Sequence, residues 1–539
     1  MHGLMMERPL IVSSLLEHVA AVHSDRAVAS YAPEEPVHRS CYGATAERVR
    51  RLAAGLQALG VRPGDRVATL ATSTHRHLEV FYAAAGIGAV CHTVNPRLHP
   101  DQVVWILNHA ESTIMLADLA FVDQAQAAFG RADRLRHLVL MADRERMPAR
   151  LPAPALCYED LLTAGAHGFA WPQFDENTAA GLCYTSGTTG DPKGVLYSHR
   201  SQILHAFAVA LPDVAGLSEA DTVLPAAPMF HVQAWGIPFA AALTGAALVL
   251  PGPRLHGAAL ADLIEEEGVT IALGVPTVWV GLINSLRASG RRLSTLKRVI
   301  VGGAACPRTM IEAFEDELGV EVRQAWGMTE MSPLGTIGTL KLKHRALAPD
   351  ERRRLQAKQG RPVFGVEIRI VDEQGQDLPH DGRSIGEILV RGPWICRQYY
   401  RSDAAGSHDG EGWFATGDVG SIDPDEYVEI TDRQKDLIKC AGEWISSVEI
   451  ETLAAEHPAV MQAAAIAASD PRWGERPVLF VVAEPGSAVS ESDVLALYRG
   501  RVAKWCVPVE VLFVEALPVG ATGKIQKRVL RDLYAGRRR

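Results

Sequence analysis

Residues 184–194 combine three glycines, four serine or threonine hydroxyls and one lysine, with an apolar segment on either side. Glycine lets the backbone adopt positive φ angles, so that several N–H groups can point toward one place. The hydroxyls add hydrogen-bond donors, and Lys193 adds a positive charge. This composition predicts a loop that holds phosphate groups. The alternative is an ordinary surface loop, although such loops seldom have this order of residues.

The loop differs from that of the nucleoside triphosphatases, which ends in Gly-Lys-Ser/Thr and opens a helix. Here Lys193 lies between Pro192 and Gly194, and the apolar residues 195–197 follow. We therefore expect the loop to lead into a strand.

Strands and helices alternate on both sides of this loop. Residues 42–59 have apolar side chains at helical spacing and stop at Gly60, which predicts an amphipathic helix. A second helix is predicted at 78–85. Apolar runs predict strands at 65–70, 89–94, 113–116, 137–140, 222–224, 247–250, 269–273 and 298–301. The alternation predicts βαβ units and a largely parallel sheet.

The pattern changes near residue 366. Residues 366–371 and 386–391 alternate strictly between apolar and polar, which predicts half-exposed antiparallel strands in a small β-rich subdomain. Beyond the charged stretch 432–436, helices are predicted at 447–455, 491–505 and 525–534, and strands at 463–467, 478–482 and 511–514. We predict an α/β protein with an N-terminal domain at 1–431, its β-rich subdomain at about 360–431, a linker at 432–436 and a small α+β C-terminal domain at 437–539.

Charge and cysteine content narrow the classes of function. The net charge of −9 argues against a nucleic-acid backbone as the main partner. The eight cysteines are widely spaced without a CxxC pair, which excludes a zinc knuckle, offers no disulfide framework and favours a reducing cytoplasm. Residues 1–7 contain no sustained apolar core, so we expect no signal peptide.

One uncharged segment, residues 232–253, is long enough to span a bilayer. It is mostly alanine and glycine, and Pro238, Gly245 and Pro251 interrupt it. We therefore predict a buried helix near 238–243 followed by a strand at 246–250, and no membrane span.

Two stretches suit an apolar acid. His231 and Trp235 lie in the otherwise apolar stretch 228–235, where the alternative is a core histidine beside a core aromatic residue. Residues 301–305, Val-Gly-Gly-Ala-Ala, follow a predicted strand and have little side-chain bulk. They suit the close approach of a flat ring or an acyl chain, and the alternative is tight packing of a helix on a strand.

Three other stretches suit a nucleotide and its metal. Residues 324–330 end a predicted strand with an aromatic face, a hydroxyl and a carboxylate. A triphosphate needs Mg²⁺, which takes few protein oxygens, so Glu330 and the phosphates are enough; the alternative is a carboxylate favoured by a helix dipole. Asp418 can hold ribose hydroxyls or stabilise a turn. Lys524, near glycines 520 and 523, can bind an anion or simply be solvated.

In order along the chain, residues 184–194, 326–330, 413–418, 432–439 and 523–525 resemble the motifs of the AMP-forming acyl-CoA synthetases. These belong to the adenylate-forming superfamily, with luciferases and peptide-synthetase adenylation domains. The resemblance covers nearly the whole chain. Residues 326–333 and 442–446 are most similar to the bacterial medium- and long-chain fatty acyl-CoA synthetases, a branch that includes methylmercaptopropionate-CoA ligases. Trp326 replaces the tyrosine of many relatives and keeps an aromatic face.

The resemblance implies two half-reactions with ATP, Mg²⁺ and coenzyme A. The acid's carboxylate attacks the α-phosphorus of ATP, which gives acyl-AMP and pyrophosphate. The thiol of coenzyme A then attacks the acyl carbon, and AMP leaves. Attack of one anion on another requires charge neutralisation, which the metal at Glu330, Lys524 and the glycine loop are expected to supply.

The resemblance also implies roles for individual residues. The predicted catalytic residues are Lys524, Glu330, His231 and Thr185, and the predicted metal ligands are Thr185 and Glu330. The predicted residues for the acid are His231, Trp235, Gly302 and Pro333. Those for the nucleotide and coenzyme A are Thr185, Ser186, Gly187, Thr188, Thr189, Gly190, Lys193, Gly303, Ala304, Ala305, Trp326, Gly327, Met328, Thr329, Asp418, Arg433, Lys435, Lys439, Gly442 and Trp444.

A mobile C-terminal domain is a further implication of the resemblance. It would rotate about Lys435 between the half-reactions, so that Lys524 leaves the site. The face with Lys439, Gly442 and Trp444 would then arrive and admit the pantetheine arm.

The resemblance predicts a fatty acid substrate, with medium chains favoured and long chains open. Trp235 favours a restricted pocket, but a tryptophan that moves aside would admit a long chain. Alternatives are 3-(methylthio)propanoate or another short acid, a carrier-protein thiol as acceptor, and a non-catalytic nucleotide-binding protein, against which the intact Lys193, Glu330 and Lys524 argue. The branch implies a homodimer; no nucleic acid and no membrane span are expected, and peripheral membrane contact stays open.

Overall fold

The computed structural model describes residues 1–537 except 2, 33–36, 165–168, 186–190, 403–408, 410, 441–442, 485 and 521–524, and for residues 164, 443 and 444 it describes the backbone alone. The chain forms two compact units. Unit 1 comprises Met1–Gly187, Asp191–Glu367 and Arg391–Phe414, and unit 2 contains Ile368–Val390 and Ala415–Arg539. The predicted domains concern a movement about residues 432–436, and their limits stay a prediction.

A nine-stranded sheet forms one layer of unit 1, in the order β16-β15-β14-β13-β12-β10-β11-β1-β2. Its strands are β1 (Ala27–Ser30), β2 (His38–Cys41), β10 (Thr222–Pro225), β11 (Ala247–Leu250), β12 (Ile271–Gly274), β13 (Arg298–Val301), β14 (Glu321–Gly327), β15 (Leu334–Ile337) and β16 (Arg361–Pro362). Neighbours from β14 to β1 are parallel. The strands at the two edges pair antiparallel.

A seven-stranded sheet forms the second layer of unit 1, in the order β7-β6-β5-β3-β4-β8-β9. Its strands are β3 (Arg66–Leu70), β4 (Val90–Thr93), β5 (Ser112–Ala117), β6 (His137–Leu140), β7 (Leu156–Cys157), β8 (Ala179–Thr185) and β9 (Lys193–Ser198). All neighbours are parallel except β8 and β9, which pair antiparallel. The predicted βαβ units and largely parallel sheets are therefore confirmed.

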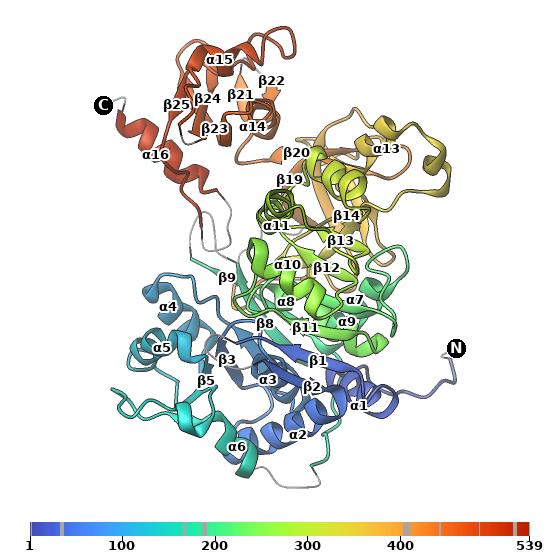
Figure 1. Ribbon diagram of the computed structural model, residues 1–539, viewed down its shortest axis with the longest axis vertical. Coiled ribbons are helices and arrows are strands. Elements are labelled where there is room, and N and C mark those ends of the chain that lie inside the picture. The colour runs from blue at the N-terminus through green and yellow to red at the C-terminus, as the bar shows by residue number, and fades with distance from the viewer. Residues whose placement is uncertain are drawn as a thin grey trace. The chain divides into compact units, whose positions relative to one another are not determined.

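Helices connect these strands (Figure 1). They are α1 (Val12–Val22), α2 (Tyr42–Ala58), α3 (His75–Gly86), α4 (Pro100–Ala110), α5 (Val122–Phe129), α6 (Tyr158–Ala164), α7 (His199–Ala210), α8 (Val232–Trp235), α9 (Ile237–Thr244), α10 (Gly257–Glu266), α11 (Pro276–Ser289), α12 (Arg308–Glu312) and α13 (Pro349–Gln356). Shorter turns are η1 (Leu119–Phe121), η2 (Arg144–Arg146), η3 (Ala313–Glu317), η4 (Thr329–Met331) and η5 (Leu342–Ala346).

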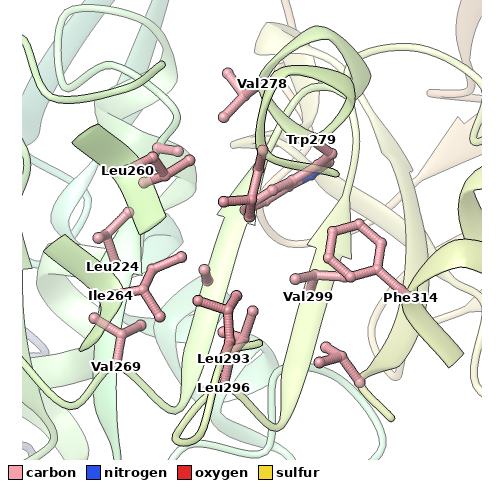
Figure 2. Close-up of a cluster of buried hydrophobic side chains, with 14 of the residues drawn as sticks. Leu224, Leu260, Ile264, Val269, Val278, Trp279, Leu293, Leu296, Val299 and Phe314 are labelled. Atoms are coloured by element: carbon pink, nitrogen blue, oxygen red, sulfur yellow. The ribbon is translucent and has the colours of Figure 1, made fainter. Parts of the chain in front are cut away.

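A core cluster between the nine-stranded sheet and helices α10 and α11 fixes the strand ends near the predicted site (Figure 2). Trp279 is fully buried there and lies edge-on to Phe314, with ring centres 5.9 Å apart. Its indole N–H donates to the carbonyl of Gly274 at the end of β12, at 3.1 Å. The same carbonyl accepts the N–H of Gly302, at 3.2 Å. The core thus sets where the chain leaves β12 and β13.

Unit 2 contains two sheets. Strands β17 (Glu367–Val371), β18 (Gly386–Arg391), β19 (Phe414–Ile422) and β20 (Val428–Arg433) form a four-stranded sheet in that order. Strands β21 (Ile438–Cys440), β22 (Glu443–Ile445), β23 (Val460–Asp470), β24 (Gly474–Ala483) and β25 (Val511–Phe513) form the other. Its helices are α14 (Ser447–Ala454), α15 (Glu491–Ala496) and α16 (Lys527–Arg537).

The helix predicted at 491–505 is wrong in length. Helix α15 ends at Ala496, and Gly500 has a φ of 72° a few residues later. A residue in the left-handed region stops an α-helix. Tyr498 leaves the helical path as well, since it is fully buried and its hydroxyl donates to the carbonyl of Ile450, at 2.7 Å.

The uncharged segment 232–253 forms helix α9 and strand β11, as predicted. Proline at the start of α9 and Gly245 at its end confine the helix to eight residues. Among the described residues, every helix is too short or too polar to cross a bilayer.

Candidate active site

The glycine-rich loop leaves β8 at Thr185 and returns in β9 at Lys193, and these two residues face each other in the antiparallel pair. The prediction that Lys193 leads into a strand is therefore confirmed. The residues predicted to hold the phosphates, Ser186, Gly187, Thr188, Thr189 and Gly190, lie outside the described residues. Their role stays a prediction.

The base of the loop is fixed by aromatic residues from two other segments. The hydroxyl of Tyr184 is hydrogen-bonded to Nδ1 of His109 at the end of α4, at 2.7 Å. The N–H of Tyr400 donates to the carbonyl of Gly194, at 2.8 Å. Both ends of the loop are thus held by contacts that the sequence did not predict.

Glu330 follows β14 in the short turn η4, and its side chain is largely buried, with a residue exposure of 6%. The hydroxyl of Tyr399 donates to its Oε1, at 2.7 Å. The backbone of this turn is held as well, because Tyr197 donates to the carbonyl of Thr329 at 2.8 Å and Cys396 N–H donates to that of Glu330 at 2.7 Å. The structure therefore gives Glu330 a defined backbone position and side-chain orientation.

Lys193 lies next to the same tyrosine. Its Nζ is 4.7 Å from the centre of the Tyr399 ring, within range of a cation–π interaction. The structure therefore brings Lys193 and Glu330, which the sequence predicts to act on ATP, to the same tyrosine.

Cys396, beside Glu330, is not a nucleophile in this arrangement. Burial, together with the nearby charge of Glu330, raises the pKa of its thiol to about 12. The thiol therefore stays protonated and unreactive at neutral pH.

The residues predicted to hold adenine lie at the end of β14. The Trp326 residue is 8% exposed, and its indole packs against Gly335. A Cβ on Gly327 would come within 1.7 Å of the carbonyl oxygen of Pro333, which also accepts the N–H of Met328 at 3.0 Å. Only glycine fits at 327, and Pro333 supports this turn.

His231 and Trp235, predicted to bind the acid, flank an unusual turn. Val232, Gln233, Ala234 and Trp235 have φ angles between 46° and 57°, so α8 is a left-handed turn. Each non-glycine residue in this conformation costs about 1–2 kcal/mol. Burial of Val232 and Ala234 and a hydrogen bond from Gln202 to the buried Gln233 offset this cost. Strain of this kind is typical of functional sites.

The left-handed turn places the indole of Trp235 against Gly302, at the end of β13. A Cβ on Gly302 would lie 3.0 Å from Cη2 of Trp235 and 3.2 Å from Cζ3. Gly303, Ala304 and Ala305 follow and are exposed, which leaves their backbone open to a ligand. The structure thus brings together Trp235 and Gly302, two of the predicted acyl-binding residues.

Asp418 and Arg433 pair across strands β19 and β20 of unit 2. The Asp418 residue is 3% exposed, and Nε of Arg433 lies 2.6 Å from its Oδ1. The N–H of Asp418 donates to the hydroxyl of Thr416, at 3.1 Å. A buried carboxylate beside a guanidinium stays ionised and can accept hydrogen bonds from ribose hydroxyls.

Asp418→Ala is expected to raise the KM for ATP by about 10- to 100-fold, because a hydrogen bond to a charged group is worth roughly 1.5–3 kcal/mol. Asp418→Asn keeps one acceptor and the shape, so it should have an intermediate KM. Initial rates of pyrophosphate release at varied ATP measure both values. Unchanged KM in the alanine variant would remove Asp418 from the nucleotide site.

The predicted hinge lies between anchored residues of unit 2. Asp432 accepts hydrogen bonds from the N–H and hydroxyl of Ser447, both at 2.6 Å. Asp436 is paired with Arg531 of α16, whose guanidinium also donates to the carbonyl of Lys435 at 3.1 Å. Lys435 itself is exposed. The hinge therefore has fixed ends.

The remaining predicted residues are only partly described. Lys439 lies on β21, where its N–H donates to Glu475 at 2.8 Å and its Nζ is 3.7 Å from Glu373. Gly442 and Lys524 lie outside the described residues, and for Trp444 only the backbone in β22 is described.

Tyr399 and His109 are site residues that sequence reasoning missed. Tyr399 lies in a stretch without glycine or charge clustering, and His109 is one of 19 histidines in the chain. No local pattern marks either residue. Only the pairing of distant segments brings them to the loop and to Glu330.

A metal ion fits this site through few protein ligands. No group of three or more His, Cys, Asp or Glu residues in the described part of the chain could hold an ion. Mg²⁺ bound with a triphosphate usually takes one or two carboxylates and fills its other positions with phosphate oxygens and water. The oriented carboxylate of Glu330 meets that requirement.

Two family models match the chain. One, described as AMP-binding enzyme, matches residues 16–400, and one described as AMP-binding enzyme C-terminal domain matches residues 449–524. A 3-methylmercaptopropionyl-CoA ligase of Ruegeria lacuscaerulensis is 49% identical over 99% of both chains. A medium-chain-fatty-acid–CoA ligase of Ectopseudomonas oleovorans is 49% identical over 99% of this chain and 98% of its own. A long-chain-fatty-acid–CoA ligase of Thermus thermophilus is 44% identical over 98% and 96%.

Solved structures are similar over nearly the whole chain. The anthranilate CoA ligase AuaEII in complex with anthranoyl-AMP has a TM-score of 0.86 and 25% identity, over 98% of this chain and 99% of that chain. ATP-bound MatB from Rhodopseudomonas palustris has a TM-score of 0.82 and 25% identity, over 97% and 99%.

Proposed function

The chain belongs to the AMP-binding enzymes and is an AMP-forming acid–coenzyme A ligase, and we propose that it activates a fatty acid, with medium chains favoured. Its fold is that of the adenylate-forming enzymes, with a large N-terminal and a small C-terminal domain. ATP and coenzyme A are its co-substrates. The observation that carries the choice of acid is the indole of Trp235 against Gly302.

The first half-reaction joins two anions, the acid's carboxylate and the α-phosphate of ATP. Lys193 and the glycine loop hold the phosphates that leave as pyrophosphate, and Lys524 neutralises charge between the carboxylate and the α-phosphorus. His231 orients the carboxylate. Asp418 holds the ribose and Trp326 stacks on the adenine, with Gly303 at the ring's edge.

Mg²⁺ is proposed as the metal, held by Glu330 with support from Thr185, and when bound it neutralises phosphate charge. Glu330 itself keeps one carboxylate oxygen on Tyr399. The buried position of Glu330 strengthens its interaction with any cation, because the local dielectric constant is low.

In the second half-reaction the thiol of coenzyme A adds to the acyl carbon of acyl-AMP, loses its proton to solvent, and expels AMP. Lys439, Gly442 and Trp444 are proposed to line the path of the pantetheine arm. The hinge at Lys435 would let these residues replace Lys524 at the acyl carbon. This exchange rests on the resemblance of residues 432–439 and 523–525 to the family motifs.

The acid pocket is proposed to be short in its resting form. The indole of Trp235 occupies the space beside Gly302, where an acyl chain would pass. The strained turn that carries Trp235 gives it a route to move, since a return to right-handed angles releases energy. Medium chains would need a small displacement and long chains a larger one.

A short thioether acid is a second candidate, because the relative of that specificity is as similar as the medium-chain ligase, at 49% identity each. Pyrophosphate release with a series from propanoate to hexadecanoate and with 3-(methylthio)propanoate, with and without coenzyme A, separates the candidates. A maximum near octanoate supports the proposal. A maximum at 3-(methylthio)propanoate replaces it. Release that continues only with an acyl-carrier protein would change the acceptor.

Trp235→Ala is expected to raise kcat/KM for hexadecanoate relative to octanoate by about 10-fold, since each methylene accommodated in an apolar pocket is worth roughly 1–3 kcal/mol. Gly302→Ala is the matched opposite change. Its Cβ would meet the indole at 3.0 Å and narrow the same space, so the ratio should fall. Pyrophosphate release with both acids measures the ratio. Equal ratios in both variants and the wild type would place the acyl chain elsewhere.

Location and assembly are further proposals. The eight cysteines are all free in the structure, which supports a reducing compartment such as the cytoplasm. The homodimer rests on the resemblance to the branch, and the molar mass in solution by light scattering tests it.

A further inference from the structure

We propose that Tyr399 is a positioning residue for acyl-AMP formation, with its hydroxyl orienting Glu330 and its ring holding Lys193. The inference rests on the proposed function, because it assigns Tyr399 a task in that reaction. Tyr399 lies in the segment between β18 and β19, which belongs to unit 1. None of the motifs recognised in the sequence includes it.

The hydroxyl of Tyr399 controls the orientation of a buried carboxylate. Its oxygen lies 2.7 Å from Oε1 of Glu330, a length typical of a hydrogen bond to an ionised acceptor. Among the described residues, no other hydrogen bond or ion pair of this side chain is recorded. Without the hydroxyl, the buried carboxylate is free to rotate and has lost the donor that stabilises its charge.

The ring of Tyr399 holds a cation on its face. Nζ of Lys193 is 4.7 Å from the ring centre. The structure records no ion pair between Lys193 and Glu330, although both contact the same tyrosine. The ring therefore acts as a spacer. It keeps the ammonium available to phosphate and the carboxylate available to a metal, two charges that would otherwise neutralise each other.

The segment that carries Tyr399 is fixed on both sides by backbone hydrogen bonds. Cys396 N–H donates to the carbonyl of Glu330 at 2.7 Å, and Tyr400 N–H donates to that of Gly194 at 2.8 Å. One end of the segment is thus tied to the turn after β14 and the other to β9. The position of Tyr399 between Lys193 and Glu330 is set by these ties, and its ring also lies edge-on to Phe414, 6.4 Å away.

Tyr399→Phe removes the hydroxyl and keeps the ring, so it separates the two tasks. Calorimetric titration of ATP into the full-length protein, with Mg²⁺ and with EDTA, gives a readout that needs no turnover. We expect binding with Mg²⁺ to weaken by about 10-fold, the effect of one hydrogen bond to a charged group. Binding in EDTA should change by less than about twofold, because the ring still holds Lys193.

Tyr399→Leu removes both contacts and should weaken ATP binding with Mg²⁺ and in EDTA alike. The concentration of Mg²⁺ that half-saturates pyrophosphate release should rise by about 10-fold in Tyr399→Phe. A loss of kcat without any change in Mg²⁺ dependence would overturn the inference, since a merely structural tyrosine behaves in that way.

Tyr158→Phe is the matched control. Tyr158 also donates to a buried glutamate, Glu79, at 2.6 Å, and it lies in helix α6 of unit 1, outside the predicted site. It should lower the melting temperature without altering the Mg²⁺ dependence of ATP binding. If Tyr399→Phe matches Tyr158→Phe in both measurements, the inference is wrong and the proposed function stands. If the wild-type protein does not bind ATP, the proposed function fails and the inference falls with it.

Discussion

Replacing Lys524 with alanine is expected to slow acyl-AMP formation by about 10³-fold, because a group that neutralises charge in a phosphoryl-group transition state contributes on that order. Transfer of supplied acyl-AMP to coenzyme A should stay within about threefold, because the phosphorus is no longer attacked in that step. Pyrophosphate release without coenzyme A measures the first step, and thioester formation from synthetic acyl-AMP measures the second.

The asymmetry between the two half-reactions is what identifies Lys524 as catalytic. Lys524 lies outside the described residues, so its role rests on the resemblance of residues 523–525 to the family motif. Lys504→Ala is the matched control, because Lys504 is an exposed lysine of unit 2 with no predicted role. It should leave both steps unchanged. An equal loss of both steps in Lys524→Ala would indicate a structural role.

Replacing Lys435 with proline is expected to spare acyl-AMP formation and to slow thioester formation by about 100-fold. Proline fixes φ near −65° in every state of the protein. A step that needs a different angle at this residue is then blocked, and conformational steps of this kind often limit turnover. The same two assays measure both half-reactions.

The structure supports residue 435 as the place where the backbone can turn. Arg433 is tied to Asp418, and Asp436 is tied to Arg531. In the described part of the chain, no backbone hydrogen bond from the N–H of Lys435 is recorded, so proline removes none. The turn itself is closed by a hydrogen bond from Asp436 N–H to the carbonyl of Arg433, at 2.8 Å.

Lys435→Ala separates the loss of the side chain from the loss of backbone freedom. It should retain both half-reactions within about threefold, since alanine keeps the φ range of lysine. A melting temperature for each variant shows whether the turn has been disrupted, because proline is disfavoured at the third position of a type I turn. Equal losses of both half-reactions in Lys435→Pro would contradict a hinge at this residue.

The order and type of the elements of unit 1 were predictable from the sequence. The strands predicted at 137–140, 247–250 and 298–301 coincide with β6, β11 and β13. These strands are covered on both faces and therefore read as short continuous apolar runs. The helix predicted at 491–505 failed because its apolar spacing continues past Ala496, whereas Gly500 and the buried Tyr498 take the chain out of the helix.

The candidate site was predictable only where its residues lie in recognisable motifs. Lys193, Glu330 and Asp418 each stand in a short stretch of unusual composition, which indicates phosphate, metal and ribose chemistry. The left-handed turn before Gly236 was not predictable, because valine, glutamine and alanine seldom adopt positive φ. Tertiary burial of Val232 and Ala234 compensates for that strain.

The sequence by itself determined the alternating α/β architecture, the phosphate loop that leads into a strand, and the class of reaction. Only the tertiary structure decided which residues meet. Lys193, Glu330 and Tyr399 come from three segments, and their contact depends on the antiparallel register of β8 with β9 and on the backbone ties of residues 396 and 400. Local periodicity encodes which face of an element is buried, whereas the pairing of distant segments depends on the complete fold.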